Sequence, residues 1–199
     1  MLSNKKTILP TSYFGSILYY KILTQNNCKI EINDFFIKQT IRNRCEILGP
    51  NKILKLSVPC KKNKEKTLTK NIKISYDENW QKIHLKSIEY SYRSSPYFEY
   101  YENIIKKIFN KKYEFLIDLN FIIHEKMLQC LNIKIKNTHT SCYNKHDRKS
   151  DLRNFDFFTK TKFKKYNQVF NTPIFYSNLC ILDLIFNLGP DANKYLQEN

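Results

Sequence analysis

The stretch TILPTSYFGSILYYKILTQNNCKIEI, from Thr7 to Ile32, decides the fold class. The short apolar segment Thr7–Pro10 predicts a first strand, and the apolar spacing within Ile17–Leu23 predicts a short helix. Apolar and charged residues then alternate over Cys28–Ile32, which predicts a second strand. A strand, a helix and a strand in this order are typical of α/β proteins, in which helices cover a sheet.

Further along the chain, strands give way to helices. Alternating residues predict strands at Leu54–Val58 and Ile72–Tyr76 and a brief one at Ile133–Ile135. Apolar spacing, capping residues and Gly or Pro stop signals predict the helices. They are expected from Trp80, from Ser95 and Pro96, over Leu116–Leu131, and after Asn178 as far as Gly189. We therefore expect a layered α/β fold with a mostly central sheet and a helix-rich second half.

The length of 199 residues predicts a single domain spanning 1–199. A hydrophobic fraction of 42% is enough for a core. Residues 137–165 are polar, basic and aperiodic, so we expect a loop or mobile insert there. No internal repeat or linker divides the chain.

The formal net charge of +16 would ordinarily suggest a nucleic-acid partner. However, Lys outnumbers Arg 29 to 5, and Lys, Asn, Ile, Phe and Tyr make up more than half of the chain. These residues have codons rich in A and T, so the bias is interpreted as genomic and the charge as a solvated surface. The five arginines kept against this bias are therefore informative, and we do not expect nucleic acid as the partner.

Six cysteines occur without any Cys-x-x-Cys pair. No secretion signal is recognised at the N-terminus, and no apolar run reaches about 18 residues, the length that a membrane-spanning helix needs. We therefore expect a cytoplasmic protein with free thiols and no membrane span.

Arg42, Asn43 and Arg44 form the first candidate site. In an extended segment Arg42 and Arg44 would point the same way, and two guanidinium groups can grip a phosphate or a carboxylate. The alternative is a surface pair that bonds backbone or Glu46.

The second candidate site lies at the start of the helix expected from Trp80. Trp80 and His84 would lie one turn apart, with Trp80 packing against a sugar or a base. His84 could act as a general base, oriented by Asp77. A core histidine satisfied by a carboxylate or a carbonyl is the alternative.

Arg93 and Ser95 form the third candidate site. A helix starting at Ser95 leaves free amide donors that, with Arg93, would suit an anion. Ordinary helix capping is the alternative interpretation.

Two further groups are weaker candidates. Asp183 and Asn187 lie four residues apart on an apolar helix, so they either anchor loops or line a pocket. His139, Cys142 and His146 match no strong zinc pattern, so no metal site is expected. With three glycines in the chain, no phosphate-binding loop or dinucleotide fingerprint is present, and no cofactor is expected.

Several segments together resemble the WbqC-like protein family, in the order in which they occur there. The segments that carry the resemblance are Gln39–Gly49, Leu56–Pro59, Ile74–His84, Tyr92–Glu102, Lys111–Leu116, Asp151–Arg153, Tyr166–Phe170 and Asn178–Pro190.

The resemblance implies a protein from O-antigen or related surface-polysaccharide gene clusters, for which a glycine or aminoacyl transferase role has been suggested. The substrate would then be a nucleotide-sugar or another phosphorylated small molecule. Cys45 is a weaker alternative to His84, as a nucleophile. The other hypothesis is a non-catalytic module that binds RNA or a protein.

Overall fold

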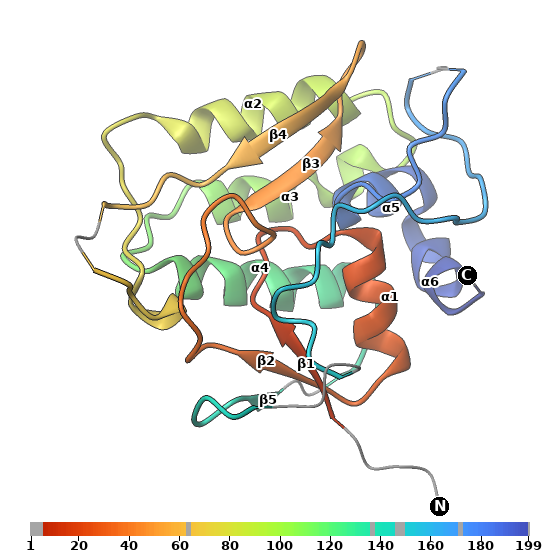
Figure 1. Ribbon diagram of the computed structural model, residues 1–199. Helices are drawn as coiled ribbons and strands as arrows, with labels where there is room; N and C mark the ends of the chain where they lie inside the picture. The colour runs from red at the N-terminus through yellow and green to blue at the C-terminus, as the bar shows by residue number, and fades with distance from the viewer. Residues whose placement is uncertain (1–5, 63–64, 136–137, 146–149, 171–172, 199) are drawn as a thin grey trace, which may run out of the picture.

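The computed structural model describes residues 6–62, 65–135, 138–145, 150–170 and 173–198. A parallel sheet in the order β1-β2-β5 lies at one end of the molecule (Figure 1). It consists of β1 (Thr7–Pro10), β2 (Cys28–Glu31) and the short β5 (Thr138–His139). Helix α1 (Ile17–Gln25) connects β1 to β2, and the Ser16 hydroxyl caps it by accepting a hydrogen bond from the Tyr19 amide. The predicted strand–helix–strand unit is confirmed.

A fourth segment joins the sheet at the free edge of β1. Ile8 donates its N–H to the Ser150 carbonyl at 2.8 Å and accepts from the Leu152 amide at 2.9 Å. The segment predicted as a loop or insert, 137–165, therefore contributes both edges of the sheet. Within its described part it contains no helix, but Phe157 is only 1% exposed, so this loop is packed against the core.

A separate antiparallel hairpin lies across the molecule from the parallel sheet (Figure 1). It pairs β3 (Arg44–Leu48) with β4 (Ile53–Ser57), with Arg44 opposite Ser57 and Leu48 opposite Ile53. The strand predicted at Leu54–Val58 is thus confirmed to within one residue at each end.

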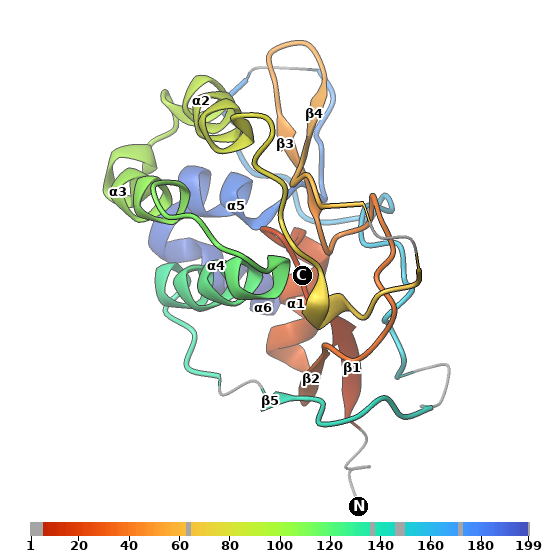
Figure 2. The same cartoon turned by 90° about the vertical axis from the view of Figure 1, so that its left-hand side faces the viewer.

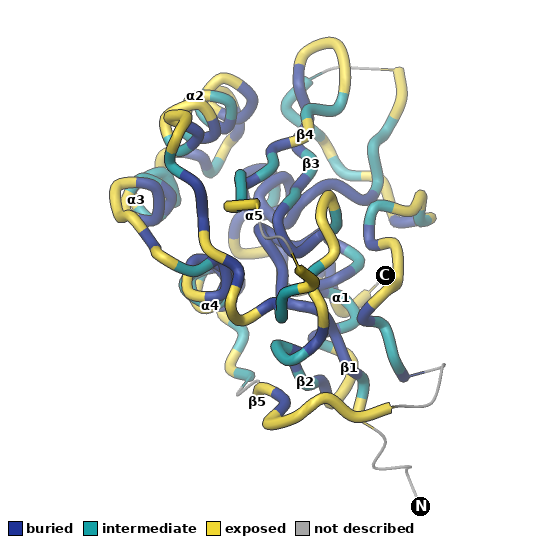
Figure 3. Tube along the Cα trace, turned by 60° about the vertical axis from the view of Figure 1, so that its left-hand side comes forward, coloured by how far each residue is buried: buried dark blue, intermediate teal, exposed yellow. Residues whose placement is uncertain are grey.

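Three helices stack as a layer along one side of the molecule (Figure 2). They are α2 (Trp80–Tyr92), α3 (Phe98–Phe109) and α4 (Leu116–Cys130), and all three were predicted. Each turns a buried face inward, toward α1 and α5, and an exposed face outward (Figure 3).

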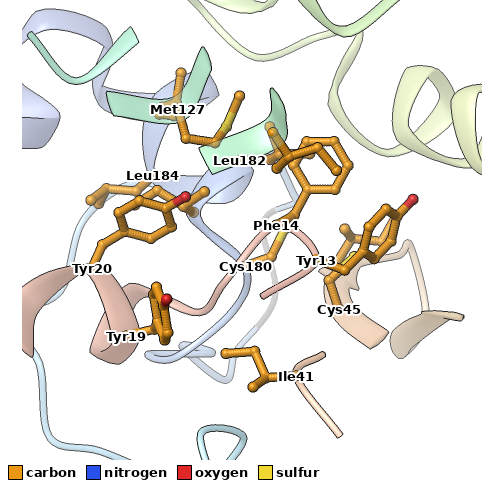
Figure 4. Packing of buried hydrophobic residues seen from close by; sticks show 14 of the residues in the cluster. Tyr13, Phe14, Tyr19, Tyr20, Ile41, Cys45, Met127, Cys180, Leu182 and Leu184 are labelled. Carbon is orange, nitrogen blue, oxygen red and sulfur yellow. The ribbon is translucent and has the colours of Figure 1, made fainter. Parts of the chain in front are cut away.

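Helix α5 (Ile181–Leu188) lies at the centre, and seven of its eight residues are buried. A 3₁₀ turn, η2 (Gly189–Asp191), follows it as the Gly-Pro stop signal predicts. The further helix α6 (Ala192–Glu198) was not predicted, because only about two turns follow the stop signal. Around α5, aromatic residues of α1 and its leading loop form the core (Figure 4).

Three predicted elements differ from the structure. Ile72–Tyr76 is not a strand: it follows a 3₁₀ turn, η1 (Thr69–Asn71), and makes only isolated bridges to Cys60 and Phe115. Ile133–Ile135 forms no strand, and β5 begins later at Thr138. The third helix of the chain, α3, begins at Phe98 rather than at Ser95, because residues 93–97 form a turn.

Gly189, the residue that ends α5, packs closely against the Tyr97 ring. Its φ is +53°, and a Cβ there would lie 2.5 Å from the Tyr97 ring. We expect Gly189→Ala to lower the free energy of unfolding by more than about 1 kcal/mol, because both the backbone angle and the ring oppose a side chain. Urea unfolding would measure this, with the exposed Lys194→Ala as control. Equal stability of the two variants would contradict this account of the packing.

Candidate functional site

Residues 41–43 form a turn and β3 begins at Arg44, so Arg42 and Arg44 do not lie in one extended segment. The amide of Arg44 donates to the Thr40 carbonyl at 3.0 Å, and this bond closes the turn just before β3. Arg44 then donates from Nε to the Ser57 hydroxyl at 2.9 Å. Arg42 is only 1% exposed and forms an ion pair with Asp34. The two guanidinium groups therefore have separate partners and do not form one fork.

Arg42 belongs to a buried network of two arginines and three carboxylates. Its Nη2 also donates to the carbonyl of Arg153 at 2.9 Å. Arg153 holds Asp151 through two parallel bonds of 2.8 and 2.5 Å and Glu31 at 3.1 Å. Asp34 accepts a further hydrogen bond, of 2.6 Å, from the Thr69 hydroxyl. Each charge is thus paired, as a buried charge must be to avoid a large desolvation cost.

This network closes the carboxyl end of the parallel sheet. Glu31, the last residue of β2, is fully buried and accepts from the amides of Ile32 and Asn33 at 3.0 and 2.8 Å. It also accepts from the hydroxyl of Thr140, which follows β5, at 2.5 Å. Ligands commonly bind at this edge of open parallel sheets. Here the edge is filled by the protein's own charged side chains.

The side chain of Asn43 stabilises the same turn. It donates to the Val58 carbonyl at 3.1 Å and accepts from the Gln39 amide at 3.0 Å. These contacts explain why an amide stands between the two arginines. The substrate-binding role predicted for Arg42, Asn43 and Arg44 stays a proposal.

His84 is a buried residue bonded to the loop that follows β1. Its Nδ1 lies 2.8 Å from the Tyr13 hydroxyl, and its side chain packs edge-on against Trp80 and Phe109. Burial lowers the pKa of His84 to about 4, so the ring is neutral at physiological pH. Trp80 is also buried, at 3% exposed.

Asp77 and Cys45, the other residues expected to take part in the chemistry, do not have the contacts or the ionisation that their predicted roles require. Asp77 binds the Ser75 hydroxyl at 2.5 Å, and within the described chain no hydrogen bond connects it to His84. Burial raises the pKa of the Cys45 thiol well above its ordinary value, which disfavours the thiolate that a nucleophile needs.

Arg93 and Ser95 lie apart from the arginine network. Arg93 is exposed and lines a small hollow of about 230 Å³, in which Glu89 and Glu102 both pair with Lys106. Ser95 is buried, and its hydroxyl has no hydrogen-bond partner in the described part of the chain. The residue two positions on, Tyr97, donates its amide to the Phe186 carbonyl at 3.0 Å and ties this turn to α5.

The turn before α3 meets the end of α5 at a hollow of about 470 Å³. Ser94 and Pro96 form one wall, Asn187 and Leu188 another, and Tyr166–Val169 the third. We call this the polar hollow. The sequence singled out the turn at Arg93–Ser95 and the Asp183–Asn187 pair separately, and one residue of each, Ser94 and Asn187, lines this hollow.

Asp183 is fully buried and is hydrogen-bonded to two residues that line the polar hollow. Its Oδ2 accepts hydrogen bonds from the Tyr166 hydroxyl and, at 2.9 Å, from the Gln168 side chain. Burial raises the pKa of Asp183, and the bonds from Tyr166, Gln168 and Tyr92 lower it by less. Among the described residues no cationic side chain forms an ion pair with it. A buried carboxylate whose hydrogen-bond donors are all neutral binds a proton more readily than an exposed one, and it attracts cationic groups.

The profile of the WbqC-like protein family matches residues 12–162. The chain belongs to the WbqC-like protein family. No curated protein and no solved structure matches it. The arginine network, His84 and the Arg93–Ser95 turn lie within the residues that this WbqC-like match covers, whereas Tyr166 and Asp183 follow it. None of the described helices of this WbqC-like protein is long and apolar enough to cross a membrane.

Several residues of the arginine network and of the polar hollow were not predicted as site residues from the sequence. Glu31 and Asp34 carried no visible signal, whereas Arg153 was among the arginines kept against the composition bias. Tyr166 and Gln168 were noted only as part of the family resemblance. In the described part of the chain no three His, Cys, Asp or Glu side chains are placed to hold a metal; His146 lies outside it.

The network predicts unequal effects of two neighbouring substitutions. We expect Arg42→Ala to lower the free energy of unfolding by about 3–5 kcal/mol, because Asp34 would remain charged and buried without its partner. The control Arg44→Ala removes one hydrogen bond from the guanidinium to a neutral hydroxyl and leaves no buried charge unpaired, so it should cost only about 1.5 kcal/mol. Chemical denaturation would compare them, and a smaller loss for Arg42→Ala would contradict the network's structural role.

The buried imidazoles predict a loss of stability in acid. The pKa of His84 falls from an ordinary 6.5 to about 4 on folding, so its contribution is present above pH 6.5 and is lost toward pH 4. This shift corresponds to about 3 kcal/mol. Burial likewise lowers the pKa of His124 to about 4.

Unfolding free energies measured from pH 7 to 4 should therefore fall in the wild type and about half as steeply in His84→Gln. Lys86→Gln, at an exposed position on the same helix, is the control and should keep nearly the full slope. An unchanged slope in His84→Gln would show that another group governs the acid response.

Proposed function

We propose that the polar hollow is the active site of an acyl transferase, specifically one that transfers a glycyl or another aminoacyl group to an activated sugar in O-antigen or related surface-polysaccharide synthesis. The observation that carries this proposal is the Asp183 carboxyl group, which has a raised pKa and is connected to the hollow through the Tyr166 hydroxyl. Membership of the WbqC-like family, in which such a transfer has been suggested, supports the reaction class.

Asp183 and Tyr166 would act as a proton relay. The attacking amine or hydroxyl of the sugar gives its proton to the Tyr166 oxygen while Tyr166 passes its own proton to Asp183. Burial beside Asp183 raises the pKa of Tyr166 well above its ordinary value, so Tyr166 stays neutral and transfers protons without ionising. A carboxyl group with a raised pKa is a better base near neutral pH than an exposed one.

In the polar hollow the acyl group would be transferred from its activating group to the sugar. A new bond forms between the sugar's nitrogen or oxygen and the glycyl carbonyl carbon, and the bond from that carbon to its activating group breaks. The proton held on Asp183 returns through Tyr166 to the leaving group. Ser94 and Asn167 supply polar groups in the walls that can donate to the carbonyl oxygen.

Asp183 also favours an amine-bearing substrate. Its charge lacks an ion-pair partner within the described residues, so a substrate ammonium or amine near Tyr166 and Gln168 would complement it. Both a glycyl donor and an amino sugar carry such a group.

The contacts favour this pair over the sequence-based assignment of His84 and Asp77 as the proton-transfer residues. His84 is 5% exposed and bonded to Tyr13, and Asp77 binds Ser75 instead. Substrate contacts by Trp80, Arg93 and Ser95 remain part of the proposal, and the Arg93–Ser95 turn adjoins the polar hollow.

The test is glycyl transfer to a nucleotide-linked amino sugar from an activated glycyl ester or thioester, followed by mass spectrometry. We expect Asp183→Asn and Tyr166→Phe each to slow transfer by about 10²–10⁴-fold, because each removes one step of the relay. The exposed Tyr100→Phe is the matched control, with unchanged transfer.

His84→Gln separates the two assignments of the base. Transfer that survives in Asp183→Asn and Tyr166→Phe but is lost in His84→Gln would return the proton-transfer role to His84. Circular dichroism of each variant checks that the fold is intact.

A further inference from the structure

A second hollow, of about 540 Å³, lies between the β3–β4 hairpin and the segment that leads to α5. Ile53 and Leu179 contribute apolar wall, and three aromatic residues, Phe158, Phe175 and Tyr176, line it as well. We call it the basic hollow, because Lys160 and Lys162 stand in the same wall. Its volume lies in the range of about 300–1,000 Å³ usual for small-molecule sites.

The basic hollow has an excess of positive charge. Lys160 and Lys162 are two residues apart, the spacing that places side chains on one side of an extended chain. In the described residues neither lysine forms an ion pair. The one carboxylate of the wall, Glu46, lies 3.5 Å from Lys55 and is balanced by it. An anionic group entering the hollow would therefore meet two unpaired ammonium groups.

An intermediate hollow of about 450 Å³ shares lining residues with both the basic and the polar hollows. Ile174 and Phe175 line both the basic and the intermediate hollows, and Tyr166 and Gln168 line both the intermediate and the polar hollows. The described parts of the segment that carries these residues lie in the loop before α5, at the right of the molecule (Figure 1). A ligand that follows these shared residues would occupy the basic hollow and reach Tyr166 with its other end.

We infer that the basic hollow binds the nucleoside diphosphate of the activated sugar. The planar base would lie against the aromatic residues, Lys160 and Lys162 would bind the phosphates, and the sugar would extend toward Tyr166. Three aromatic rings in the wall suit a planar base better than a flexible chain. This inference rests on the proposed function, since it assigns a binding site to the nucleotide end of the same proposed substrate.

Isothermal titration of the full chain with UDP, ADP and GDP, and with inorganic diphosphate, tests the assignment. We expect at least one nucleoside diphosphate to bind, and inorganic diphosphate to bind at least about tenfold more weakly, because it lacks the base. Lys160→Glu with Lys162→Glu should weaken the nucleotide by about tenfold or more. The control, Lys82→Glu with Lys86→Glu on the exposed face of α2, makes the same change in net charge and should bind as the wild type does.

The possible results separate this inference from the proposed reaction. No binding, or an equal loss in both double variants, would overturn the basic hollow as the site. Inorganic diphosphate that binds as tightly as the nucleotides would overturn the role given to the aromatic wall. Asp183→Asn and Tyr166→Phe should keep nucleotide binding; if they do while no transfer occurs in the wild type, the binding site stands and the transferase reaction does not.

Discussion

The pairing of Arg42 with Asp34 is the interaction on which the arrangement of the other parts depends. Through Arg42 and Arg153 it joins the end of β2, the turn into the β3–β4 hairpin and the segment beside β1. The segment at Asp151–Arg153, more than 100 residues further along the chain, is thereby held against the end of β2 and the turn that leads to β3. A lysine could supply the positive charge but not several donors in fixed directions. Arg42 uses them to reach a carboxylate and a carbonyl, and Arg153 uses them to reach two carboxylates.

The sequence predicted the elements whose apolar pattern is local. The strand–helix–strand unit at the N-terminus, helices α2 and α4 and the buried helix α5 follow from spacing alone. Ile72–Tyr76 alternates like a strand, but its neighbours Cys60 and Phe115 each bridge only one residue, so tertiary packing overrides the pattern. The start of α3 was misplaced because Ser95 and Pro96 resemble a helix start but belong to a turn.

The candidate site was predictable only in fragments. The retained arginines marked important positions, but composition cannot tell a ligand clamp from an internal ion pair, since both require the same guanidinium geometry. Asp183 was recognisable as a polar residue on an apolar helix, whereas its partner Tyr166 comes from an aperiodic segment with no local signal. The polar hollow depends on three segments meeting in space, and spacing along one segment does not encode that meeting.

The order of the parallel sheet has a consequence for folding during synthesis. β1 and β2 lie within the first 31 residues, but their outer neighbours, β5 and the segment at Asp151, come after residue 137. Until then both outer strand edges of a nascent chain stay unpaired, and such edges favour association with other chains. Pairing across so many residues also makes the sheet slow to close. During synthesis the outer edges of β1 and β2 therefore stay exposed to other chains until more than two thirds of the protein has been made.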